Sequence, residues 1–200
     1  FRAPLRAKLE TLVKQASPRY FGLDAAGGQL FAVYLDPKFQ QPMIVVMGQD
    51  ADPTKARVVL DPNKLDPTGG TSFDWFVPAP DGERIAVSLS KGGSEDGSLH
   101  VFDVATGQQV GDAIPRVQYP TAGGDAAWTP EGKGFWYTRY PGPDRPADEQ
   151  HFHQTVWFHR LGEDPKADVQ VFGDGLPEIA ALKLHYSDEA GALVVTVLNG

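Results

Sequence analysis

Short apolar runs separated by turn residues dominate the chain after its first segment. The runs are rich in valine, isoleucine and aromatic side chains, and clusters of Gly, Pro, Asp and Asn lie between them, which is typical of strands joined by tight turns. We predict strands at residues 31–35, 43–47, 57–60, 85–89, 99–103, 135–140, 155–160 and 193–198. The sequence therefore predicts an all-β body over residues 18–200.

One segment has a helical period. Its apolar positions are spaced i, i+4 and i+7: Leu5, Leu9 and Leu12. Pro4 suits the first turn of a helix, and Ser17 with Pro18 ends the pattern. We expect a helix from Pro4 to about Ala16, within an N-terminal helical segment of residues 1–17.

A turn glycine followed by an apolar strand recurs along the chain. The glycines are Gly28, Gly82, Gly132 and Gly191, at intervals of 54, 50 and 59 residues. These intervals are close to the roughly 40–50 residues of one β-propeller blade. We therefore interpret residues 18–200 as a partial β-propeller of about four blades; a β-sandwich with accidental spacing is the alternative.

Composition excludes several classes of protein. The net charge of −8 argues against nucleic acid as a partner, because phosphate binding needs clustered Lys and Arg. Without cysteine there is no disulfide, thiolate metal site or cysteine nucleophile. No apolar run approaches the roughly 18 residues of a membrane helix, so we expect no membrane partner. The first residues also lack Met and the apolar core of a signal peptide, and we take the chain to be a piece of a longer protein.

Two segments carry a resemblance to a known family. They read A-W-T-P-E-G-K-G-F-W-Y at residues 127–137 and H-Q-T-V-W-F-H-R-L-G at residues 153–162. The corresponding family patterns are A-W-T-x-D-G-K-G-F-x-Y and H-Q-x-[LV]-Y-[YF]-H-x-L-G, so this sequence departs at Glu131 and Trp157. The chain resembles the N-terminal propeller region of the prolyl oligopeptidase family of serine peptidases.

The resemblance implies a seven-bladed propeller paired with an α/β-hydrolase domain that carries a Ser-Asp-His triad and is absent from this chain. In that family the propeller admits short peptides and excludes folded proteins. The resemblance thus implies the substrate-gating part of a serine endopeptidase that cleaves short peptides after proline, with no cofactor and no catalytic residue in this chain. This fragment alone is expected to be inactive.

Two other functions stay open: a non-catalytic binding or scaffold propeller, and the propeller of an oligopeptidase B-like enzyme that cleaves after basic residues. We expect a cytoplasmic protein, with the periplasm as the alternative.

Tyr119 is the substrate-binding residue that the resemblance implies. Family members have an aromatic residue in V-x-[FY] that lines the substrate pocket from the propeller side, and V-Q-Y at residues 117–119 fills this pattern. Residues 120–125 look like a short insertion next to it. A loop-packing tyrosine is therefore the alternative.

Ser94 resembles a nucleophile only superficially. A nucleophile elbow needs Gly-x-Ser-x-Gly between a strand and a helix. Around Ser94 the second glycine is one position late, and a predicted strand follows. We therefore predict an inter-strand loop there.

The remaining polar candidates are histidines, carboxylates and arginines. His151, His153 and His159 share strand parity, but an extended strand separates the last two by about 20 Å. A His151 and His153 pair with a nearby carboxylate is the alternative to our interpretation, which is polar blade positions and no metal. We read the adjacent carboxylates at 95/96, 148/149 and 188/189 as solvated loops. Arginines can bind a carboxylate through two hydrogen bonds, but nothing in the sequence brings these together: Arg139, Arg145 and Arg160.

Overall fold

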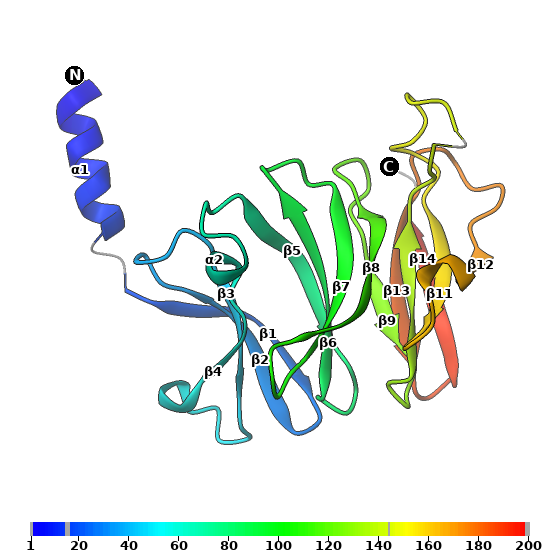
Figure 1. Cartoon of the computed structure of the whole chain (residues 1–200), viewed down its shortest axis with the longest axis horizontal. Helices are drawn as coiled ribbons and strands as arrows, with labels where there is room; N and C mark the ends of the chain where they lie inside the picture. Colours follow the sequence, from blue (N-terminus) through cyan, green and yellow to red (C-terminus); the bar gives the residue numbers. More distant parts are fainter. Residues whose placement is uncertain (1, 15–16, 144, 199–200) are drawn as a thin grey trace.

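Four antiparallel sheets stand side by side in the computed structural model, which describes residues 2–14, 17–143 and 145–198 (Figure 1). Helix α1 (Arg2–Lys14) projects away from the first sheet. The strands are, sheet by sheet, β1 (Arg19–Ala26), β2 (Gln29–Leu35), β3 (Met43–Met47) and β4 (Arg57–Leu60); β5 (Thr71–Pro78), β6 (Arg84–Lys91), β7 (Gly97–Asp103) and β8 (Gln109–Gln118); β9 (Ala126–Trp128), β10 (Gly134–Arg139), β11 (Thr155–Arg160) and β12 (Val169–Phe172); β13 (Ala181–Ser187) and β14 (Ala192–Leu198).

The all-β prediction is confirmed, and so is the blade-like arrangement. All eight predicted strands are present, and β3, β4 and β11 have the predicted bounds. Helix α1 covers most of the predicted helix, whose last two residues, 15 and 16, lie outside the described residues. The structure adds six strands that the sequence pattern did not predict: β1, β5, β8, β9, β12 and β13.

The recurring glycine has one structural role. Gly28, Gly82, Gly132 and Gly191 each lie in the hairpin between the first and second strands of a sheet. Their φ angles are +70°, +71°, +63° and +60°, a conformation that glycine adopts without a steric penalty. The repeat in the sequence is therefore a repeat of one hairpin turn.

The first strands of successive sheets meet along one edge of the molecule. β1 contacts β5, β5 contacts β9, and β9 contacts β13. In each four-stranded sheet the later strands follow in sequence order away from this edge. This radial order is that of propeller blades around an axis.

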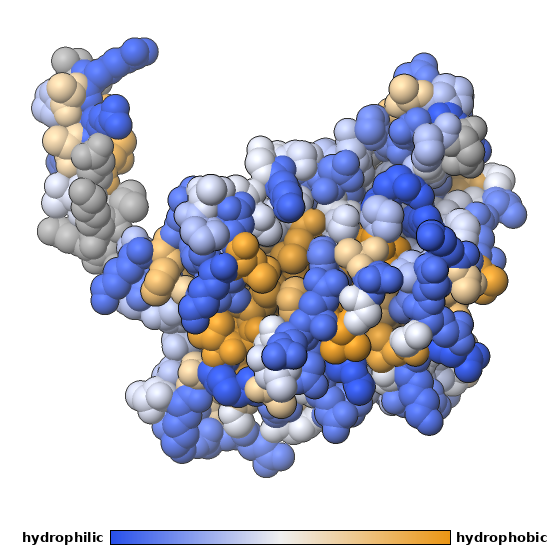
Figure 2. Space-filling model, in the orientation of Figure 1, coloured by the Kyte–Doolittle hydropathy of each residue, from blue (hydrophilic) through white to orange (hydrophobic). Residues whose placement is uncertain are grey.

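The core lies between neighbouring sheets, because successive residues of a strand point to opposite faces. In β3, Ile44 and Val46 join a buried cluster with Val87 of the second sheet. Met43 and Val45 belong to a separate cluster on the other face of the first sheet. Apolar side chains also gather in the middle of the face seen in Figure 2, over the sheets.

The aromatic residues of the 127–137 motif fill the next interface. Trp128, Phe135 and Tyr137 are buried between the second and third sheets. Val156 and Leu182 are buried together between the third and fourth sheets. Each interface is therefore built from one face of each adjoining sheet.

Three short helical turns begin at Asp-Pro pairs: η1 (Pro53–Lys55), α2 (Pro62–Leu65) and η2 (Pro165–Ala167). In each case the aspartate side chain accepts a backbone N–H two residues on, and proline occupies the first helical position. No helix in the described ranges is long and apolar enough to cross a membrane.

Candidate functional site

Tyr119 directly follows β8 at the end of the sheets opposite the glycine hairpins. The Gly123 N–H donates to the Tyr119 carbonyl at 2.8 Å, which closes residues 119–123 into a loop. The Tyr140 hydroxyl donates to the Gly123 carbonyl at 2.9 Å. Burial raises the pKa of Tyr140 to about 12, so this hydroxyl keeps its proton, and its hydrogen bond to the loop, at an alkaline pH where an ordinary tyrosine begins to ionise.

The Tyr119 ring is half-buried and rests on residues from its own chain. It stacks on the His151 ring with a centroid distance of 3.9 Å and an interplanar angle of 8°. The Tyr119 hydroxyl lies 3.2 Å from His151 Nε2. The rings of Tyr119 and Tyr140 meet edge to face, with their centroids 5.9 Å apart. Asp96 and Arg116 help to line a cavity of about 70 Å³ beside it. Tyr119 therefore has one ring face covered by His151 and stays partly exposed.

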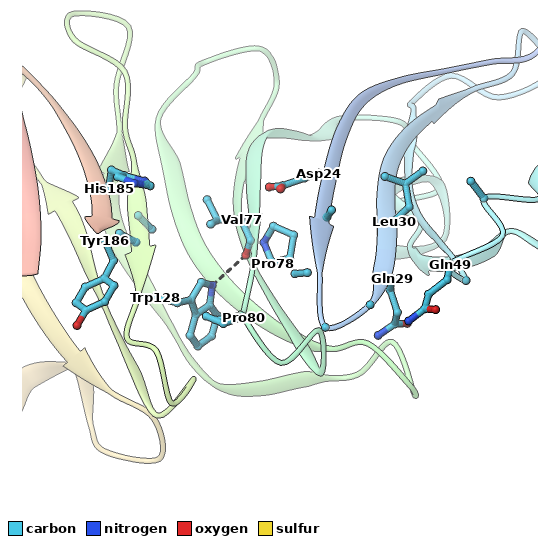
Figure 3. A pocket seen from close by; sticks show the side chains of 18 of the residues that line it. Asp24, Gln29, Leu30, Gln49, Val77, Pro78, Pro80, Trp128, His185 and Tyr186 are labelled. Carbon is cyan, nitrogen blue, oxygen red and sulfur yellow. Dashed lines mark hydrogen bonds between the residues drawn. The ribbon is translucent and has the colours of Figure 1, made fainter. Parts of the chain in front are cut away.

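A larger cleft of about 840 Å³ follows the first strands of all four sheets (Figure 3). Asp24 comes from β1, Val77 from β5, Trp128 from β9 and His185 from β13. The Trp128 indole N–H donates to the Val77 carbonyl at 3.0 Å, which ties two of these strands together. The cleft also includes the hairpin at Gly28 and therefore lies toward the end away from Tyr119.

This central cleft offers a mixed lining and little chemistry of its own. Gln29 and Gln49 supply amides, and Pro78 and Pro80 supply apolar surface. No nucleophile paired with a base lines it among the residues that the structure places there. The cleft is suited to holding or passing an extended chain.

Ser94 lies in the loop between β6 and β7, as predicted. Its N–H donates to the Lys91 carbonyl at 3.1 Å, and its hydroxyl accepts the Asp96 N–H at 3.2 Å. The strand β7 follows, and Glu95 and Asp96 are exposed. The interpretation as an inter-strand loop is confirmed.

The prediction that the three histidines share the parity of one strand is wrong, because only His159 lies in a strand, β11. His151 and His153 lie in the segment before β11, because the strand begins only at residue 155. His151 contacts Tyr119, whereas His153 Nε2 lies 3.8 Å from a Glu149 oxygen. Across the described ranges, no three His, Cys, Asp or Glu side chains gather as a metal ion would require.

Two of the three arginine candidates meet. Arg139 and Arg145 line one cleft together with Arg116, which the sequence did not indicate. Arg160 lies elsewhere, exposed and 3.5 Å from Glu163. His151 was also missed as a partner of Tyr119, since 32 residues separate the two and no local pattern links them.

Comparison with known proteins shows which family and which relatives this chain resembles. Residues 2–200 match the family described as prolyl oligopeptidase, N-terminal β-propeller domain. The prolyl endopeptidase of Elizabethkingia miricola is 28% identical over 167 residues, which are 80% of this chain and 22% of that protein. The prolyl oligopeptidase ophP of Omphalotus olearius is 30% identical over 128 residues, covering 58% of this chain and 17% of that protein.

Solved structures agree on the fold. One, from a study of two prolyl endopeptidases and the role of inter-domain dynamics in catalysis and specificity, has a TM-score of 0.84 and 25% identity; the match covers 98% of this chain and 28% of that one. Prolyl oligopeptidase B from Galerina marginata, bound to a 25-residue macrocyclization substrate, has a TM-score of 0.76 at 18% identity, over 96% of this chain and 30% of that one. This chain spans less than a third of each of these proteins.

Proposed function

The chain belongs to the family of prolyl oligopeptidase N-terminal β-propeller domains, and from this premise we propose that it is the substrate-gating propeller of a serine endopeptidase. The enzyme hydrolyses short peptides after proline. The α/β-hydrolase domain of the same protein is its partner and supplies the catalytic residues, and no cofactor is needed. The protein works in the cytoplasm.

The position of Tyr119 carries this proposal. The residue is partly exposed at the end of the sheets, where the family pattern V-x-[FY] implies a contact with substrate. The stack on His151 and the fastened loop hold the ring in one orientation. A fixed aromatic ring binds an apolar side chain with little loss of conformational entropy.

The central cleft supports a gating role. It runs along the first strands of four successive sheets, so its wall is built from the elements that face a propeller axis. Tyr119 lies outside this wall, after β8 at the opposite end of the second sheet. A folded domain of about 100 residues has a radius of gyration of about 13 Å and does not fit within a cleft of about 840 Å³.

The test compares Tyr119→Ala with the wild type in the protein as its gene encodes it. Loss of about 1–3 kcal/mol of apolar contact lowers kcat/KM on tri- and tetrapeptide substrates about 5- to 150-fold. Because His151 already covers one face of the ring, we expect the lower part of that range. A single-residue proline amide does not reach Tyr119 and should be cleaved at the wild-type rate.

Tyr119→Phe is the matched control. It keeps the ring and loses only the hydroxyl beside His151, so it should keep the preference for longer peptides. Equal losses of Tyr119→Ala on long and short substrates would show that Tyr119 is a packing residue. Absence of any cleavage after proline by the wild type would refute the proposed function itself.

A further inference from the structure

A basic cleft of about 390 Å³ opens on the third sheet, where β10 ends and β11 begins. Arg116, Arg139, Arg145 and His153 line it, and Asp174 is the one acidic side chain among its described lining residues. The whole chain has a net charge of −8, so the sign of this lining is opposite to that of the chain as a whole. A concave surface of one sign concentrates ligands of the opposite sign.

Two of the arginines are held in place. The Arg139 guanidinium lies over the Trp157 ring, 4.8 Å from its centroid. Such stacking uses the flat face of the guanidinium and keeps its N–H donors in one plane, the arrangement that binds a carboxylate through two hydrogen bonds. Arg116 Nε donates to the Tyr140 carbonyl at 3.3 Å. The cations are therefore positioned before any ligand arrives.

The rim of the cleft already binds a carboxylate from this chain. Arg145 donates to Glu149 Oε2 at 2.8 Å, and His153 Nε2 lies 3.8 Å from the same oxygen. These side chains thus converge on a single carboxylate oxygen. The arrangement shows the kind of ligand that the rim fits.

Backbone strain is concentrated at this cleft. The structure describes four non-glycine residues with positive φ, and two of them, Arg116 at +62° and His153 at +58°, line it. Hydrogen bonds hold both backbones: the Arg116 carbonyl accepts the Tyr140 N–H, and the His153 N–H donates to the Glu178 carbonyl, each at 2.8 Å. Strained backbone that the surroundings hold in place is typical of ligand-binding sites.

The cleft adjoins Tyr119, because Arg116 and Tyr140 line both this cleft and the small cavity beside Tyr119. We propose that the basic cleft binds an acidic side chain of a peptide substrate, upstream of the cleaved bond. This inference rests on the proposed function, in which Tyr119 contacts the upstream residues. It assigns a preference for an acidic upstream side chain to residues of the propeller.

The experiment uses the protein as its gene encodes it and proline-containing peptides that differ only in Glu or Gln at one upstream position, scanned over successive positions. At one of these positions the Glu peptide should have a kcat/KM about tenfold higher, the size expected for a partly exposed charge-assisted contact. The preference should fade at high salt, because exposed charges are screened.

Matched variants assign the effect to the cleft. Arg145→Gln and Arg139→Gln should each remove most of the preference, and the first changes an exposed residue whose loss does not threaten folding. Arg160→Gln alters the net charge equally on an exposed arginine outside the cleft and should keep the preference. Glu149→Gln removes the chain's own carboxylate from the rim and should strengthen the preference for the Glu peptide.

Equal cleavage of the Glu and Gln peptides at every position would overturn the proposal while leaving the proposed function intact. A preference that survives both Arg145→Gln and Arg139→Gln would overturn it as well. If the protein cleaves no proline peptide, the proposed function fails, and calorimetric titration of the same peptide pairs still tests the cleft. Tighter binding of the Glu peptide that depends on Arg145 would then support the carboxylate site.

Discussion

Gln154 joins the third sheet to the fourth, and its replacement gives a local test of how the sheets are held together. The side chain is 2% exposed. Its Oε1 accepts the Leu182 N–H at 2.9 Å, and its Nε2 donates to the Gly123 carbonyl at 2.9 Å. The first strand of the fourth sheet is thereby attached to the third sheet through one buried amide.

Gln154→Met keeps the length of the side chain and removes both hydrogen bonds. The Gly123 carbonyl retains the Tyr140 hydroxyl as a donor, whereas the Leu182 N–H loses its acceptor in a buried site. One buried donor left without a partner costs about 1–3 kcal/mol. The free energy of opening β13 should fall by this amount.

Amide hydrogen exchange of β13 measures this change directly. A loss of about 1–3 kcal/mol corresponds to exchange of the Leu182 amide about 5- to 150-fold faster. Gln170→Met is the matched control, because the Gln170 side chain is exposed and bonds to Asp174 rather than to another sheet. Unchanged exchange at Leu182 in Gln154→Met would refute the reasoning.

Four further substitutions test two of the hairpins and two of the carboxylates. Gly27→Ala should lower the free energy of unfolding by several kcal/mol in urea denaturation, because the φ of Gly27 is +56° and a Cβ there would lie 2.0 Å from the Asp81 carbonyl oxygen. Gly191→Ala is the control: its φ is +60° with open space around it, and it should cost only about 1 kcal/mol. Equal losses in the two variants would contradict the close approach at Gly27. Burial raises the pKa of Asp74, partly offset by two serine hydroxyls, so the wild type should lose stability relative to Asp74→Asn as the pH rises above the ordinary value of 3.8. The hydrogen bonds from Thr106 lower the pKa of Asp103, so the wild type should lose stability relative to Asp103→Asn as the pH falls below the ordinary value of 3.8. Urea midpoints of the wild type and each Asn variant, measured between pH 3 and pH 7, test both directions. A change of the same sign for Asp74 and Asp103 would contradict the opposite pKa shifts.

Most of the strands that the sequence predicted contain buried residues on both faces, although β14, which has no buried residue, was predicted and the wholly buried but three-residue β9 was not. In β3 every residue is buried, so an unbroken apolar run marks the strand. β12 is exposed at all of its residues and β1 at most of them, and such strands lack the apolar contrast on which the prediction depends. β13 could have been found, because Leu182 and Leu184 alternate with Lys183 and His185 in the period of a half-buried strand.

The candidate site was less predictable than the fold, because its contacts join distant segments. Tyr119 could be named from a pattern, but its partner His151 belongs to the segment between β10 and β11. Arg116 contributes from the second sheet to a cleft whose other arginines belong to the third. These side chains come together only because the second and third sheets pack against each other. The spacing of the residues along the sequence therefore does not predict the contacts.

The residues that carry the family resemblance work mainly between and within the sheets. Trp128 ties β9 to β5, and Gln154 ties the third sheet to the fourth. His159 and Tyr137 both bond to the buried Asp168 carboxylate at 2.8 Å, which fastens the turn before β12 to the middle of its sheet.

The side chains proposed to meet a peptide lie outside those two motifs or at their margin. Tyr119 and Arg145 belong to loops at one end of the sheets, and His153 begins the second motif. Gln154 and Trp157 of the second motif also line the basic cleft, so the residues that fix the blade packing and those proposed to select the substrate are different side chains that meet there. We expect substitutions in the loops to change peptide preference while the propeller stays folded. Arg145→Gln should alter cleavage and leave hydrogen exchange in β13 unchanged. Gln154→Met should accelerate exchange in β13, and unchanged exchange there would contradict its role in joining the sheets.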